Sequence, residues 1–135
     1  MGKIYCFDPV IYPRVIWMTY DATPDQLNEL FPDGDEFGES FEEFTEDSAA
    51  ITSEVEAGDG SGLGGILIRF KNKNNITFGH SAHECSHAAI CIFHYIHATV
   101  SYDFQETYCY LVEFIADCCE KLKKGNIDKS EIYIG

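Results

Sequence analysis

The chain has 135 residues, 45% hydrophobic and 24% charged, a composition typical of one soluble globular domain spanning residues 1–135. Its net charge of −14 has the wrong sign for a protein that grips nucleic-acid phosphates, so we expect no nucleic-acid partner. No apolar run reaches the ~18 residues that a membrane span needs, and residues 1–8 do not resemble a secretory signal peptide, so we expect no membrane partner.

The first part of the chain predicts two strands and a short helix. β-Branched and aromatic residues cluster at 3–7 and 10–20, and Pro13 makes the start of the second run irregular. Thr23 and Pro24 are typical of a helix N-terminus, and the sequence after Phe31 ends that helix.

The segment 21–60 is strongly acidic. It holds fourteen acidic residues and no lysine or arginine, whereas the rest of the chain has nine of each sign. We interpret the segment as a solvated face; the alternative is a surface for a basic partner. Phe37, Phe41 and Phe44 recur within it at helical spacing, which predicts a second amphipathic helix.

The second half predicts a hairpin followed by two long helices. Residues 50–57 alternate in polarity, a glycine-rich turn follows, and residues 65–71 form the partner strand. Helical periodicity covers 79–97, and Asp103 with Glu106 predicts a capping box for a helix that ends at Gly125. With a last edge strand near 132–134, the fold class is α+β, with a small antiparallel sheet packed on two long helices.

The chain contains six cysteines that do not form a CxxC pair. Five of them fall inside the predicted helices, which favours reduced thiols in a reducing compartment over disulfides. A four-cysteine zinc site is therefore not expected.

The segment from His83 to His87 reads His-Glu-Cys-Ser-His. On a helix, residues four apart share a face, so both imidazoles can reach one Zn²⁺ while Glu84 reaches the metal-bound water as general base. This is the HExxH pattern of metallopeptidases. The competing interpretation is a helix that exposes two histidines beside a glutamate by chance.

A catalytic zinc needs a third protein ligand. His94 lies about 10 Å further along the same helix, too far to join the pair. Glu106 follows His87 by nineteen residues, at the start of the next helix, and is our first candidate. The other downstream candidates are His97, Asp103, Glu113 and Asp117.

The motif with a glutamate nineteen residues later resembles the gluzincin branch of zinc metallopeptidases. The segment from Gly79 to about Leu122 is also similar to small HExxH proteins of bacteriophage and prophage genomes. This resemblance covers about a third of the chain. It implies Zn²⁺ held by His83, His87 and Glu106, a zincin-like (minigluzincin) core, and peptidase activity of unspecified substrate in a bacterial host cytoplasm or a virion.

The sequence departs from the gluzincin pattern at Tyr110, where that pattern has an aspartate. Tyr110 either donates its hydroxyl near the site or is amphipathic core. The strand Ile66–Phe70 is either the edge that aligns a peptide or a central core strand. Two further functions stay open: a non-catalytic interaction protein that uses the acidic segment, and a virion component in which proteolysis has lapsed.

Overall fold

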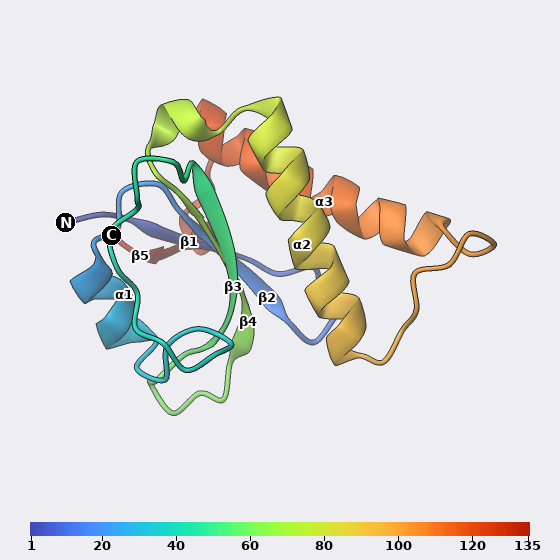
Figure 1. The fold of residues 1–135 in the computed structure, drawn as a ribbon, viewed down its shortest axis with the longest axis horizontal. Coiled ribbons are helices and arrows are strands. Elements are labelled where there is room, and N and C mark those ends of the chain that lie inside the picture. The colour runs from blue at the N-terminus through green and yellow to red at the C-terminus, as the bar shows by residue number, and fades with distance from the viewer.

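The computed structural model describes residues 1–135 and contains one five-stranded sheet with helices on both faces (Figure 1). The protein has the expected α+β fold. The elements, in chain order, are β1 (Ile4–Phe7), β2 (Val15–Thr19), α1 (Pro24–Leu30), β3 (Ala50–Glu56), β4 (Gly64–Phe70), η1 (Lys73–Asn75), α2 (Phe78–Tyr95), α3 (Glu106–Lys124), η2 (Lys129–Glu131) and β5 (Ile132–Ile134).

The strands are ordered β3-β4-β2-β1-β5. The predicted β3–β4 hairpin is antiparallel, and β1 pairs antiparallel with both β2 and β5. β2 and β4 run parallel, so the sheet is mixed rather than wholly antiparallel. β4 therefore lies inside the sheet, which gives Ile66–Phe70 the role of a central core strand, and β3 is the edge next to α2.

Strands β2 and β4 are buried on both faces, and their residues alternate between two cores. Ile16, Met18 and Ile68 pack under α2 and α3, in a core that includes Ile92 and Ile115 on those helices. The opposite core lies under α1 and the acidic segment, and its members include Trp17, Val55, Leu67, Leu27, Phe31 and Phe41.

Capping explains where the helices begin and end. Thr23 and Gln26 form a capping box on α1, and Thr77 accepts a hydrogen bond from the His80 N–H at the start of α2. α3 ends at Gly125, whose φ of 75° is the left-handed conformation expected of a helix stop. The prediction that Asp103 caps α3 is wrong, because Gln105, two residues later, occupies the N-cap position.

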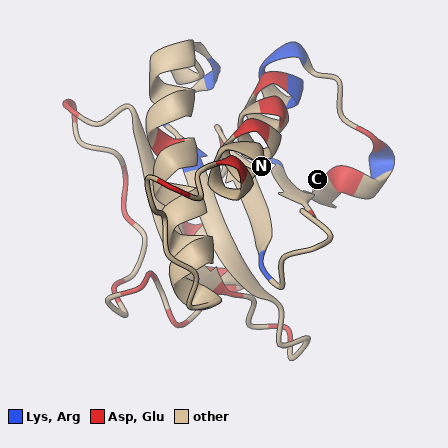
Figure 2. Ribbon diagram, turned by 90° about the vertical axis from the view of Figure 1, so that its right-hand side faces the viewer, with Lys and Arg blue, Asp and Glu red and all other residues tan.

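The acidic segment between α1 and β3 is not helical, so the second amphipathic helix predicted there is wrong. Gly34 and Gly38 adopt positive φ, and the Asp35 side chain accepts hydrogen bonds from the N–H groups of Phe37 and Glu39. These local turns replace the i→i+4 bonds of a helix. Figure 2 shows acidic positions strung along these loops. None of the helices is both long and apolar enough to cross a bilayer.

Candidate metal and catalytic site

The two histidines of the motif lie one turn apart on the outer face of α2. Their Nε2 atoms are 3.1 Å apart, and their ring centroids are 4.8 Å apart. The pair is open to solvent, since the side chain of His83 is 67% exposed. The predicted convergence of His83 and His87 on one point is therefore present in the fold.

Glu84 turns away from solvent toward the edge strand. Only 6% of the residue is exposed, and its Oε1 accepts a 2.8 Å hydrogen bond from the hydroxyl of Thr52 on β3. Its Oε2 lies 4.0 Å from the Nε2 of His83. Thr52 thus holds the carboxylate beside the histidine pair. This contact could not be predicted from the sequence, because alternation along β3 does not reveal which helix packs on each face of the strand.

The histidine pair fits two positions of a zinc site. Nitrogens bound at ~2.0–2.1 Å to one tetrahedral zinc lie roughly 3.3 Å apart, close to the 3.1 Å between the two Nε2 atoms. A zinc-bound water also needs an acceptor nearby, and the free oxygen of Glu84 is in that neighbourhood.

The structure does not bring the proposed third ligand to this pair. Glu106 is the first residue of α3 and is exposed. No group of three or more His, Cys, Asp or Glu side chains is placed so that it could hold a metal ion. The other downstream candidates are likewise not gathered around His83 and His87.

Tyr108, rather than Tyr110, is the tyrosine of α3 that contacts the motif helix. Its hydroxyl donates to the carbonyl oxygen of Ser86 at 3.3 Å, and its ring lies edge-on to Phe93. Tyr110 is 64% exposed, so it is not part of the core. Residues two positions apart on a helix do not share a face, so Tyr110 points away from α2 when Tyr108 contacts it.

The other motif-helix residues have structural roles. The Sγ of Cys85 lies 3.6 Å from that of Cys119 in the core between α2 and α3. The hydrogen bond to Cys119, together with burial, raises the pKa of Cys85, which disfavours a nucleophilic thiolate. The Nδ1 of His80 is 2.8 Å from the carbonyl oxygen of Asn75, a contact that anchors the start of α2.

The edge of β3 beside Glu84 has main-chain groups that β4 does not use. The Ala49–Lys71 pair is hydrogen-bonded, and bonded pairs alternate along antiparallel strands, so odd-numbered residues of β3 bond to β4. The open edge therefore presents the main-chain groups of Thr52, Glu54 and Glu56. One of them is already occupied, since the N–H of Glu54 donates to a carboxylate oxygen of Glu36 at 3.0 Å.

Comparison with known proteins identifies no relative of this chain. The chain matches no protein-family model, no curated protein and no solved structure. The functional argument therefore rests on the residues of α2 and β3 themselves.

Proposed function

We propose that the protein is a zinc-dependent peptidase of the HExxH type with a zincin-like core. The observation that carries the proposal is the paired Nε2 atoms of His83 and His87, with the buried carboxylate of Glu84 beside them. Bound zinc would supply a water of lowered pKa and would polarise a peptide carbonyl. In this proposal His83 and His87 hold the metal.

Glu84 is the proposed general base. Its Oε2 faces the histidine pair, while the Thr52 hydroxyl bonds the other oxygen and fixes the orientation of the carboxylate. A carboxylate fixed in this way needs no rearrangement before it accepts a proton. Because Glu84 is nearly buried, competing water has little access to it.

Glu106 remains the proposed third ligand, and Asp103 and Glu113 are the alternatives. For Glu106 to bind, the first turn of α3 must shift toward the histidine pair. That turn has no side-chain cap, and it follows a loop from 96 to 105 without regular structure. The end of a helix, next to an irregular loop, rearranges at a lower free-energy cost than the middle of a helix.

The proposed substrate is a peptide in extended conformation along β3. The edge has free main-chain groups at Thr52, directly beside Glu84, and β-strand addition is a general way to hold a peptide. The same edge orients the general base, so a bound backbone would lie close to the groups that act on it.

Metal analysis and a peptidase assay test this proposal together. Protein purified without chelator is expected to contain one zinc per chain, and His83→Ala to lose it. Glu84→Gln should keep zinc and lose activity by about 10²–10⁴-fold. Glu56→Gln is the control: it changes an exposed carboxylate at the end of β3 and should keep both zinc and activity. Full zinc retention in His83→Ala would contradict the proposal.

The acidic segment favours a second candidate function, a non-catalytic interaction protein. Its fourteen carboxylates lie mainly on exposed loops, and no basic residue within the segment neutralises them. A phage-encoded or virion-associated protein could bind a basic host protein in this way. Such binding would weaken steeply between low and high salt, whereas Glu84→Gln would leave it unchanged.

A further inference from the structure

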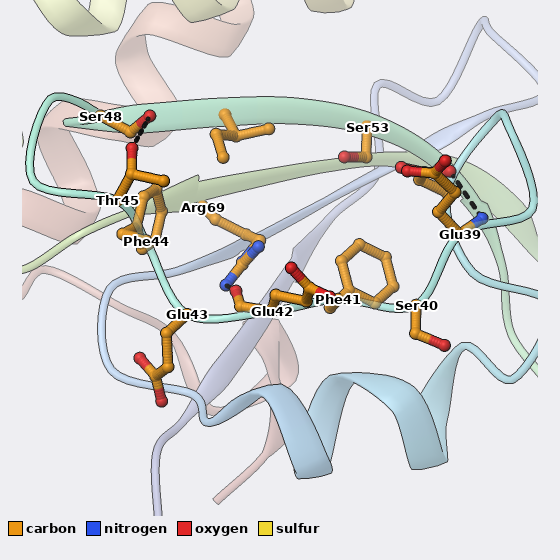
Figure 3. Close-up of a pocket in the computed structure, with 12 residues that line it drawn as sticks. Glu39, Ser40, Phe41, Glu42, Glu43, Phe44, Thr45, Ser48, Ser53 and Arg69 are labelled. Carbon is orange, nitrogen blue, oxygen red and sulfur yellow. Dashed lines mark hydrogen bonds between the residues drawn. The ribbon is translucent and has the colours of Figure 1, made fainter.

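A cavity lies on the face of β3 and β4 opposite α2. Its volume is about 510 Å³, and the loop of residues 39–48 forms its other wall (Figure 3). Small-molecule sites typically enclose ~300–1,000 Å³. The peptidase proposal uses none of the residues that line this cavity.

Arg69 of β4 is a buried cation with unused donors on this cavity. It is 5% exposed, and its guanidinium packs between Phe41 and Phe44, with 4.7 Å from its Cζ to the ring centroid of Phe44. Its single hydrogen bond, 2.9 Å long, goes to the carbonyl oxygen of Glu42. A guanidinium has five N–H donors, and Arg69 takes part in none of the ion pairs of the chain. The charge of the nearby Glu43 acts on Arg69, but no carboxylate bonds the guanidinium directly, so the remaining donors suit an anionic group.

Ser53 of β3 adds a second unused polar group. It is 5% exposed, its hydroxyl makes no hydrogen bond in the chain, and Figure 3 shows that hydroxyl on the cavity side of the strand. Ser48 lines the same cavity, but its hydroxyl oxygen already accepts a hydrogen bond from Thr45 at 3.2 Å. The Ser53 oxygen is not among the fully enclosed polar atoms that lack a partner, so it reaches the cavity space and can bond a polar ligand atom there.

The remaining lining determines which ligand fits. Four acidic residues are among those that line the cavity, and their charge would repel a ligand that carries only negative charge. They are Asp35, Glu39, Glu42 and Glu43. Phe41, Phe44 and Ile51 give the same cavity an apolar wall. The lining therefore suits a molecule with a carboxylate, an ammonium group and an apolar body.

We propose that this cavity binds a free α-amino acid with an apolar side chain. The carboxylate is received by Arg69 and Ser53, the ammonium group faces the acidic rim, and the side chain contacts Phe41 and Phe44. Guanidinium–carboxylate hydrogen bonds supply the directional part of the recognition. The site is separate from the histidine pair, so binding does not require zinc.

Calorimetric titration with three related probes tests the ligand class. L-Leucine is expected to bind saturably, with a dissociation constant below about 1 mM. Isocaproate lacks the ammonium group and isoamylamine lacks the carboxylate, and each should bind at least about tenfold more weakly. A chelator should not change the leucine affinity. Absence of saturable leucine binding up to about 10 mM, or equal affinity for either of the other two probes, would overturn the proposal.

Variants assign the binding to these side chains. Ser53→Ala should weaken leucine binding about fivefold or more, and Arg69→Lys about tenfold or more, because a lysine offers no planar pair of donors. Ser48→Ala is the control. It should bind leucine normally, because the Ser48 hydroxyl is already hydrogen-bonded to Thr45. If Arg69→Lys does not fold, Ser53→Ala against Ser48→Ala decides. Unchanged affinity in a folded Ser53→Ala or Arg69→Lys would overturn the assignment.

Discussion

One hydroxyl group on the edge strand fixes the only buried carboxylate of the protein. Glu84 is the sole acidic residue among the buried polar groups, and Thr52 is its hydrogen-bond donor. A buried carboxylate without a partner is costly, so Thr52 matters for stability as well as for the proposed chemistry. The pairing joins a strand residue to a helix residue that follows it by thirty-two positions.

Thr52→Val removes the donor while keeping the shape of the side chain. We expect the free energy of unfolding to fall by about 1–3 kcal/mol, because Glu84 loses its partner inside the fold. In a Glu84→Leu background the same substitution should cost clearly less, because only the longer 3.3 Å contact of the Thr52 hydroxyl with the carbonyl oxygen of residue 84 is left to lose. Chemical denaturation of the four proteins measures the coupling. Equal losses in both backgrounds would show that the two residues do not interact.

Glu106→Gln tests the third ligand of the proposed zinc site. As a ligand, Glu106 should contribute an anionic oxygen, and its replacement should weaken zinc binding by about 10–100-fold. As a simple N-terminal helix carboxylate, it should affect only stability, by about 0.3–1 kcal/mol. Zinc affinity and the unfolding midpoint, measured on this variant and on Glu113→Gln, separate the two roles. Unchanged zinc affinity would transfer the role to Asp103 or Glu113.

At the scale of elements, the sequence predicted what local patterns determine. Polarity alternation located β3, and capping residues located the start of α1 and the end of α3. Pairing between distant strands was beyond such patterns, so the parallel β2–β4 contact was missed. The helical spacing of Phe37, Phe41 and Phe44 led to a wrong prediction of a helix. The main chain of Phe41 is held instead by long-range hydrogen bonds, because its N–H and C=O both bond the Asn28 side chain.

The candidate site, like the fold, was predictable from the sequence only in part. Spacing on one helix was enough to pair His83 with His87, since four residues make about one turn. The contact of Glu84 with Thr52, and the cavity around Arg69, depend on how strands and loops pack across the sheet. Spacing along the chain also does not fix where the start of α3 lies relative to α2.

Two capping substitutions test the helix boundaries. Thr23→Ala should destabilise the protein by about 0.5–2 kcal/mol, because it removes the hydroxyl that accepts the Gln26 N–H at the start of α1. Asp103→Ala should leave stability within about 0.5 kcal/mol, because Asp103 makes no cap on α3. Thermal or urea unfolding checks both. A clear loss in Asp103→Ala would mean that α3 begins earlier than Glu106.

At the scale of the whole molecule, the main feature is the excess of negative charge. The net charge is −14, and the acidic residues of one segment account for all of it. Repulsion among these carboxylates destabilises the compact state. Dissolved salt screens this repulsion.

Salt should therefore stabilise the folded protein. Raising sodium chloride from about 0.02 M to 0.5 M is expected to raise the melting temperature, since the Debye length falls from roughly 20 Å to about 4 Å. Replacing Glu42, Glu43, Glu46 and Asp47 by their amides should raise the melting temperature at low salt and reduce the response to salt. A melting temperature that falls with added salt would contradict the expected repulsion.

The open edge of β3 also bears on how copies of the chain behave toward one another. An unpaired strand edge is a template for strand pairing between molecules, which leads to aggregation. Here the edge strand bears Glu54 and Glu56, and a carboxylate of Glu36 already bonds one of its amides. These like charges act as gatekeepers: two copies that approach edge to edge bring carboxylates together. The same negative charge that lowers the stability of each folded copy therefore hinders edge-to-edge pairing between copies. The edge of β3 beside Glu84 stays accessible as a result.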